Sequence, residues 1–183
     1  MSTITNPVAT AEAAERARAV KLMVFDVDGI LTDGRLYLTD SGEEMKAFHT
    51  LDGQGLKMLR DSGVEIAILT ARQSRVVARR AAELGITHLR QGAADKRAGF
   101  AELLAECNVQ AGNAGYIGDD LVDLPVLIRS AFSASVPEAP EAVRSRVHYV
   151  THAAGGHGAA REVCEFILRA QGRFEQALAR YLE

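Results

Sequence analysis

Two aspartates stand two positions apart, directly after an apolar run of the chain. Asp26 and Asp28 follow residues 21–25 and precede Gly29, which lets the chain turn sharply away. Side chains two apart on an extended strand point to the same side, so we expect these carboxylates to share one small space. Such a pair is costly unless a divalent cation neutralises it or one member keeps a proton. Both solutions suit phosphoryl transfer, with Asp26 attacking phosphorus and Asp28 protonating the departing oxygen.

Further along the chain, other residues suit the same chemistry. Thr70 ends the apolar run 64–69, where its hydroxyl and the N–H groups of a helix start could hold phosphate oxygens. Lys96 begins a helical pattern, and its point charge suits a transferring phosphoryl group. Three acids then follow a third apolar run, and like charges there repel unless a cation or a lysine is near. These acids are Asp119, Asp120 and Asp123.

Each of these features alone has an ordinary explanation. A DxDG segment also fits a solvated loop or a simple metal-binding turn, Thr70 fits a helix N-cap, and Lys96 fits a surface lysine. Together, and in this order, the four sites predict a phosphotransfer centre with a hard divalent ion, Mg²⁺, as the cofactor.

Apolar runs alternate with helical patterns along the chain. Strands are expected at 21–25, 64–69, 114–117 and 131–136, and helices at 54–61, 74–84, 95–107 and 158–169. Strand–helix alternation predicts a parallel sheet with helices on both faces, a three-layer Rossmann-like α/β fold with functional groups at the carboxyl ends of the strands. We expect one domain over residues 21–171, preceded by a flexible or partly helical extension (1–20) that frays, and followed by a tail (172–183).

Residues 31–48 interrupt the alternation. They contain two short segments of strand-forming residues around the turn 40–43, a pattern typical of a β-hairpin. The hairpin would leave the sheet directly after the Asp26 and Asp28 pair.

The composition excludes several classes of function. Hydrophobic residues make up 48% of the chain and charged residues 25%, the net charge is -3, and no dense Lys/Arg stripe occurs, which argues against a nucleic-acid or anionic-membrane partner. No apolar run approaches the roughly 20 residues that span a bilayer, and the start of the chain lacks a signal core, so we expect a cytoplasmic protein with a small polar substrate. Cys107 and Cys164 lack metal or redox spacing and are expected to be buried free thiols.

The ordered set of DxD, Thr, Lys and GDDxxD resembles the haloacid dehalogenase (HAD) superfamily of aspartyl-phosphate phosphatases, over about residues 21–171. Within it, the closest likeness is to the family of 3-deoxy-D-manno-octulosonate 8-phosphate phosphatases, in FDVDGILTDGRLYL, GEEMKAFHTLDGQGLKML, LGITHLRQGAADK, YIGDDLVDLPV and GGHGAAREVCEFILRAQG. Two positions depart from the usual pattern. Ala71 replaces a glycine, and His157 replaces an arginine, which removes a cation near the presumed substrate end.

The resemblance implies a role for each matching residue. Asp26 would be the nucleophile and a metal ligand, and Asp28 the general acid/base, whose backbone carbonyl also touches the metal. Asp119 would be the third protein ligand of the metal, and Thr70 and Lys96 would contact the phosphate. Asp120 and Asp123 would orient Lys96 and metal-bound water.

The resemblance also implies the substrate and the assembly. The substrate would be an eight-carbon sugar-acid phosphate of lipopolysaccharide precursor synthesis. The 31–48 hairpin is too small to cover a site, so a homotetramer would supply the lid, with joined hairpins and C-terminal tails that reach neighbouring sites. Residues suited to the substrate's carboxylate and hydroxyls are Thr32, Lys46, Arg72, Arg80, His157 and Arg161.

Three alternatives stay open at this point. The substrate could be a nine-carbon sialic-acid-type phosphate. The chain could be a receiver-like phosphorylation switch, although a receiver carries its phosphate-accepting aspartate after the third strand. A non-catalytic phosphosugar-binding protein is the third alternative, although binding alone does not need carboxylates in both attacking and proton-donating positions.

Overall fold

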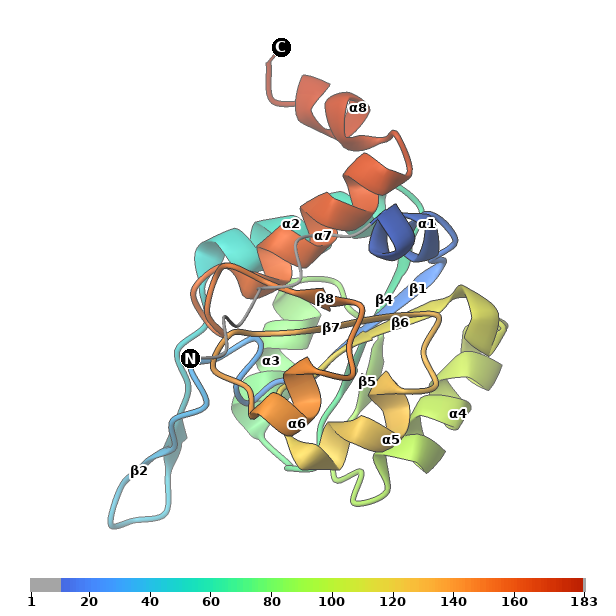
Figure 1. The fold of residues 1–183 in the computed structure, drawn as a ribbon. Coiled ribbons are helices and arrows are strands. Elements are labelled where there is room, and N and C mark those ends of the chain that lie inside the picture. The colour runs from blue at the N-terminus through green and yellow to red at the C-terminus, as the bar shows by residue number, and fades with distance from the viewer. Residues whose placement is uncertain (1–10, 183) are drawn as a thin grey trace, which may run out of the picture.

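A parallel sheet of six strands forms the centre of the protein, in the order β5-β4-β1-β6-β7-β8 (Figure 1). The computed structural model describes residues 11–182. All residues of β1, β6 and β7 are buried, as expected for strands covered on both faces. The predicted three-layer α/β fold is therefore confirmed. The strands are β1 (Leu22–Phe25), β4 (Glu65–Leu69), β5 (His88–Arg90), β6 (Ala114–Ile117), β7 (Phe132–Ser135) and β8 (Tyr149–Val150).

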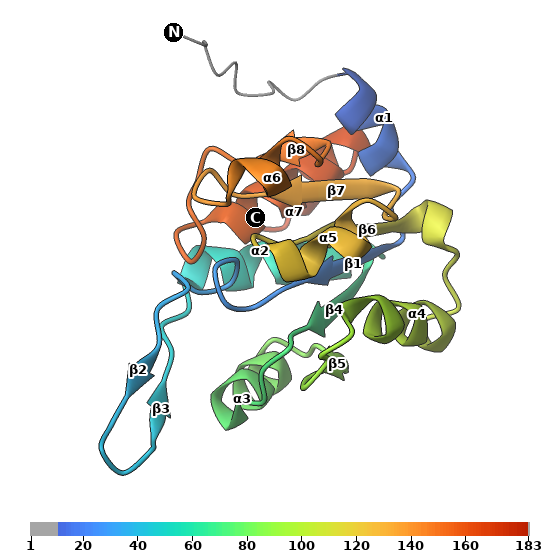
Figure 2. The same ribbon diagram turned by 60° about the horizontal axis from the view of Figure 1, so that its bottom comes forward.

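Helices pack on both faces of this sheet. Helices α1, α2 and α7 gather on one face, while α4 and α5 cover the other (Figures 1 and 2). Two 3₁₀ helices, η1 (Ala111–Asn113) and η2 (Leu121–Asp123), flank β6. The α-helices are α1 (Ala11–Arg18), α2 (Thr50–Asp61), α3 (Arg75–Glu83), α4 (Lys96–Glu106), α5 (Leu124–Leu127), α6 (Glu141–Arg144), α7 (Ala159–Ala170) and α8 (Phe174–Ala179).

A small antiparallel hairpin follows β1, as predicted. Its strands β2 (Tyr37–Leu38) and β3 (Glu44–Met45) are only two residues long, and the hairpin projects away from the domain (Figure 2). Leu38 and Met45 are 63% and 62% exposed. The hairpin thus presents apolar side chains that this single chain does not cover.

The predicted N-terminal extension is helical over residues 11–18, which agrees with the partly helical alternative. These residues form α1, which packs on α7 and β7 and buries Ala13 and Ala17 completely, whereas a loose, fraying segment was expected. The first ten residues lie outside the described part of the chain. In the predicted tail, α8 forms a short helix beyond α7 (Figure 1).

Two strands and one thiol also differ from expectation. Strands β5 and β8 are two or three residues long and were not predicted. Both cysteines are free; Cys164 is buried as expected, but Cys107 is only partly buried.

Within residues 11–182, no helix is long and apolar enough to cross a membrane.

Candidate active site

Polar residues that follow three neighbouring strands lie side by side at one edge of the sheet. Because β1 lies between β4 and β6, Asp26, Thr70 and Asp119 come together although they are far apart in the sequence. They line a hollow of about 280 Å³, which Asp28 and Lys96 also line. The Thr70 hydroxyl accepts a weak hydrogen bond from the N–H of Arg72 within its own turn (3.4 Å).

Lys96 is buried between two carboxylates. Its Nζ lies 2.9 Å from Oδ2 of Asp26 and 2.6 Å from Oδ1 of Asp123, and it also donates to the Tyr116 hydroxyl at 3.3 Å. Helix α4 begins at this lysine because the Asp95 side chain caps the helix. The ammonium group is therefore fixed beside Asp26, where it can contact a phosphoryl group.

Asp123 is completely buried, and hydrogen bonds occupy both of its oxygens. Oδ1 accepts from Lys96 and from the Tyr116 hydroxyl, and Oδ2 accepts from the backbone N–H groups of Asp119 and Asp120 (3.1 Å each). Asp123 therefore contacts both Lys96 and the loop after β6. Its implied role in orienting metal-bound water stays a prediction. Tyr116 was missed in the sequence, where its only signal was a hydroxyl-bearing side chain in an otherwise apolar strand.

Asp120 lacks the predicted contact with Lys96. Its carboxylate accepts the N–H of Leu121 at 2.7 Å and caps η2, and it does not contact Lys96. Asp120 nevertheless lines the hollow together with Asp26 and Asp119. Its expected role toward metal-bound water stays a prediction.

The acidic groups fit a hard divalent cation. Carboxylate oxygens of Asp26, Asp119 and Asp123 all lie within 4.8 Å of one another. Burial and the neighbouring Asp123 raise the pKa of Asp26 to about 7, and the same two causes raise the pKa of Asp119 to about 7. Lys96 opposes both shifts without cancelling them, so this corner of the protein still favours additional positive charge.

Gly29 is required where the chain leaves this cluster. A Cβ atom at this position would lie 2.0 Å from Oδ2 of Asp119, and the backbone φ of +86° is one that side-chain-bearing residues rarely adopt. The glycine therefore lets Asp119 approach the turn after Asp26.

The carboxylate of Asp28 faces the hairpin. Its Oδ1 contacts the buried Nζ of Lys46, and its Oδ2 lies 3.7 Å from Nε of Arg72. Arg72 lines the hollow, whereas Lys46 contacts Asp28, which lines it. Contacts of both cations with the substrate stay predictions. The side chain of Asp28 lies outside the group formed by Asp26, Asp119 and Asp123. Its implied contact with the metal through the backbone carbonyl stays a prediction.

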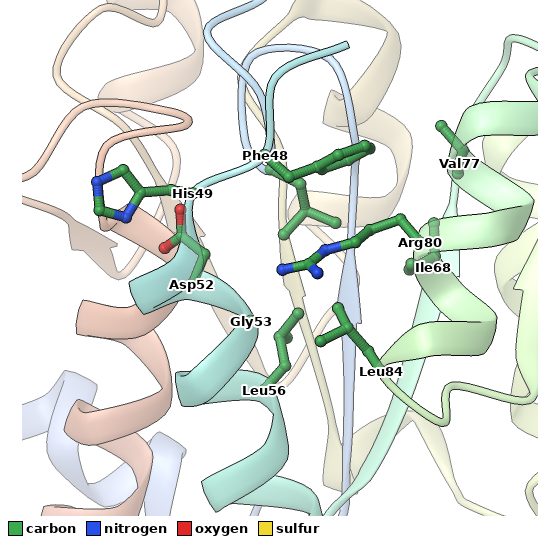
Figure 3. Close-up of a pocket in the computed structure, with 10 residues that line it drawn as sticks. Phe48, His49, Asp52, Gly53, Leu56, Ile68, Val77, Arg80 and Leu84 are labelled. Carbon is green, nitrogen blue, oxygen red and sulfur yellow. The ribbon is translucent and has the colours of Figure 1, made fainter.

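Three other substrate candidates have local partners. The buried Thr32 hydroxyl bonds to the carbonyl of Val27 (3.3 Å) and accepts from the N–H of Gly34 (3.2 Å). On α7, Arg161 pairs with Glu165 at 2.6 Å. Arg80 reaches from α3 across a separate pocket toward α2, with its guanidinium 5.8 Å from the centre of the Phe48 ring (Figure 3).

His157 lies in a hollow of about 320 Å³ next to the first one. Gly34 and Asp119 line both hollows. Of the six substrate candidates, the structure therefore places Lys46 and Arg72 beside Asp28 and His157 nearby, and it places Thr32, Arg80 and Arg161 in local packing contacts.

Similarity to known proteins agrees with this geometry. No family model matches the chain. The chain is 42% identical over 177 residues to the 3-deoxy-D-manno-octulosonate 8-phosphate phosphatase KdsC of Salmonella typhi, covering 97% of this chain and 94% of the relative. A crystal structure of a "probable yrbi family phosphatase" from Pseudomonas syringae is 51% identical, with a TM-score of 0.93 over 95% of this chain and 99% of that chain.

A second crystal structure includes ligands. It is the 3-deoxy-D-manno-octulosonate 8-phosphate phosphatase of Moraxella catarrhalis in complex with magnesium ion, phosphate ion and KDO. It is 44% identical, with a TM-score of 0.91 over 93% of this chain and 98% of that chain. On this identity and coverage, the chain belongs to the 3-deoxy-D-manno-octulosonate 8-phosphate phosphatase family.

Proposed function

We propose that this protein is a magnesium-dependent phosphatase that hydrolyses 3-deoxy-D-manno-octulosonate 8-phosphate to the free sugar acid and phosphate. Its relative from Moraxella catarrhalis was crystallised with magnesium, phosphate and the sugar acid. The observation that carries the proposal is the buried Asp26–Lys96–Asp123 array at the end of β1 in a chain of this family. Family membership does not favour the nine-carbon substrate, the receiver-like switch or the non-catalytic binding protein.

Asp26 and Asp28 divide the first chemical step between them. A carboxylate oxygen of Asp26 forms a bond to phosphorus while the bond from phosphorus to the sugar oxygen breaks. The electron pair of the broken bond stays on the sugar oxygen, which takes the proton of Asp28. The sugar acid leaves as an alcohol, and Asp26 carries the phosphoryl group.

Water completes the cycle. It attacks phosphorus and gives a proton to Asp28, while the bond from phosphorus to the Asp26 oxygen breaks. Phosphate leaves, and both aspartates return to their starting states. Throughout, Lys96 and Thr70 contact the phosphoryl oxygens, and Asp123 keeps Lys96 in place.

Asp26, Asp119 and the backbone carbonyl of Asp28 would hold the magnesium ion. When bound, the ion neutralises the charge of the carboxylates and of the phosphoryl oxygens. Asp123 is the weaker candidate ligand because hydrogen bonds already occupy both of its oxygens.

The assembly and the cellular role belong to the same proposal. A homotetramer in the cytoplasm, acting in lipopolysaccharide precursor synthesis, would join the apolar hairpins and bring C-terminal tails over neighbouring sites. The exposed Leu38 and Met45 on the hairpin support association, as does the placement of α8 beyond the end of α7 (Figure 1).

A phosphate-release screen tests the reaction, the cofactor and the substrate together. The purified protein would be assayed with the eight-carbon sugar-acid 8-phosphate, a nine-carbon sialic-acid-type 9-phosphate and simple hexose phosphates, each with and without Mg²⁺. We expect release that depends on Mg²⁺ and a kcat/KM that is highest for the eight-carbon substrate. An equal or reversed preference would remove the substrate assignment, and a stable phosphoprotein without phosphate release would indicate a switch.

A further inference from the structure

Four alternating charges meet where the hairpin joins the domain. Lys46 contacts Asp28 and lies 3.2 Å from Oε1 of Glu44. Arg72 makes the same pair of contacts, with its guanidinium nitrogens 3.7 Å from both Asp28 and Glu44. Two cations are therefore shared between two carboxylates. One of these carboxylates, Glu44, has no role in the chemistry described above.

The local sequence explains how Glu44 reaches this cluster. Side chains alternate along a strand, so Glu44 and Lys46 point to the domain side of β3 while Met45 points outward and is 62% exposed. The backbone pairing of β2 with β3 covers only two residues on each strand and places few constraints on the hairpin. The charge cluster, together with a hydrogen bond between the Glu44 and Ser74 side chains, therefore links the hairpin to the loops after β1 and β4.

Two of the charged groups in this cluster are buried. The Lys46 side chain is 1% exposed, and a buried ammonium group is tolerated only when carboxylates surround it. Oε1 of Glu44 is buried, and it has no well-aligned hydrogen bond. The contacts of this oxygen with Lys46 and Arg72 are thus charge contacts, at 3.2 Å and 3.7 Å.

We propose that Glu44 is a positioning residue for the general acid. By holding Lys46 and Arg72, it fixes the carboxyl group of Asp28 where the leaving oxygen of the substrate will lie. Glu44 acts through its neighbours and contacts no reacting atom. The inference rests on the proposed phosphatase chemistry, but it does not depend on which sugar phosphate is the substrate.

The leaving group provides the test. A sugar or alkyl phosphate needs proton donation to its departing oxygen, whereas p-nitrophenyl phosphate has a leaving group that departs without it. The kcat/KM value reports the steps up to that departure. We expect Glu44→Gln to lower kcat/KM at least tenfold for the sugar-acid phosphate and for an alkyl phosphate, and less than threefold for p-nitrophenyl phosphate. Both substrates are compared on one protein preparation, so any loss of folded protein cancels.

Glu43→Gln is the matched control. Glu43 is an exposed neighbour on the same hairpin, and its side chain forms no ion pair with any residue of 11–182. This variant should keep wild-type values with both classes of substrate. The variant Lys46→Met should show the same selectivity for leaving groups, and adding Glu44→Gln to it should cost less than twofold more.

Three results would overturn the inference. They are an equal loss with both classes of substrate, no loss with either, or full additivity of the two substitutions. A wild-type protein that hydrolyses alkyl and aryl phosphates but not the eight-carbon substrate would instead count against the substrate in the proposed function, and the ratio test for Glu44 would still apply.

Discussion

Lys96 explains, at the level of single residues, how several aspartates can share one corner of the protein. Its ammonium group lies between Asp26 and Asp123, both nearly or fully buried, and the Tyr116 hydroxyl completes the arrangement. Removing one partner from such a group leaves charges without compensation in a poorly solvated site. The catalytic arrangement and the stability of the fold therefore depend on the same contacts.

Replacing the lysine should destabilise the protein strongly. We expect Lys96→Met to lower the free energy of unfolding by about 3–5 kcal/mol, because two buried carboxylates lose their counter-charge. Urea unfolding would measure this. Lys21→Met, at an exposed lysine just before β1, should change the same quantity by less than about 0.5 kcal/mol. A similar result for both variants would contradict the structural role of Lys96.

The nucleophile can be tested without disturbing the fold. Asp26→Asn removes the attacking oxygen but keeps the size of the side chain, so turnover should fall by more than about a thousandfold while the thermal midpoint stays the same or rises. The rise would come from removing one of the mutually repelling acids. Phosphate release and differential scanning fluorimetry would report the two effects, and substantial residual turnover would exclude Asp26 as the nucleophile.

The raised pKa values predict how stability changes with pH in the metal-free protein. Between about pH 4 and pH 7, the folded protein keeps protons on Asp26 and Asp119 that the unfolded chain has lost. Stability should therefore fall as pH rises through this window. The pKa values of Glu44 and Glu162 are lowered from the ordinary value of 4.5. These two groups therefore stabilise the folded protein above about pH 4.5, and the effect is lost only as pH falls further.

Added Mg²⁺ should raise the thermal midpoint more at pH 8 than at pH 5, because the carboxylates must lose their protons to bind it. Thermal unfolding with and without EDTA would measure this. Asp119→Asn should flatten the pH dependence of the metal-free protein, and Asp120→Asn, which removes one of the smaller causes of the raised Asp119 pKa, should change it less. A metal-free protein that is more stable at pH 8 than at pH 5 would contradict the assignment.

At the scale of elements, glycines let distant segments approach closely enough to build the site. The loop before α7 packs against the turn after β1, where the N–H of Gly156 donates to the carbonyl of Ile30 at 2.9 Å. Asp52 on α2 accepts the N–H groups of Gly158 (3.3 Å) and Arg161 (2.8 Å), which fixes the start of α7. The loop before α7 thereby supports the turn after β1, which directly follows the nucleophile Asp26.

A methyl group added at Gly155, where the loop before α7 meets the turn after β1, should impair both folding and catalysis. A Cβ atom at residue 155 would lie 1.8 Å from the carbonyl oxygen of Gly29, so Gly155→Ala must displace one of the two backbones. We expect a lower thermal midpoint and at least a tenfold lower kcat/KM. Gly112→Ala, where the added methyl group meets no atom within 4 Å, is the control and should behave like the wild type. Wild-type behaviour of Gly155→Ala would show that the contact is not needed.

At the scale of the whole molecule, one chain leaves its site partly open. No residue of the β2–β3 hairpin (37–45) lines the hollow at the carboxyl edge of the sheet. The hairpin projects away from the domain (Figure 2), and its residues Leu38 and Met45 are exposed. Closing a phosphatase site against water needs more surface than this hairpin provides. Association of several chains is the simplest way to supply that surface.

Polar substitutions on the hairpin should separate the proposed tetramer. The double variant Leu38→Ser and Met45→Ser removes the exposed apolar surface, so we expect a smaller assembly in light scattering coupled to size exclusion, and weaker activity on the sugar-acid phosphate. Ile128→Ser changes another exposed apolar residue, 56% exposed at the end of α5, and should leave the assembly intact. An unchanged tetramer in the hairpin variant would place the interface elsewhere.

Local patterns in the sequence were sufficient for the main strands and for the residues that follow them. Apolar runs that end in polar residues mark buried strands, so the positions of Asp26, Thr70 and Asp119 at one sheet edge could be predicted. The strands β5 and β8 could not, because runs of two or three residues carry no periodic signal and pair only beside an existing strand. The burial of α1 was missed for a related reason, since its alanines become part of the core only through contact with α7.

The sequence by itself determined the α/β fold, the family and the candidate nucleophile, because strand patterns and a DxD segment are properties of neighbouring residues. Only the tertiary structure decided which partner each charge has. Asp123 pairs with Lys96 and Tyr116, Asp28 turns to Lys46, and Glu44 joins them from the hairpin. Charge pairing depends on distances between segments that are remote in the chain, and those distances exist only once the sheet and its helices have packed.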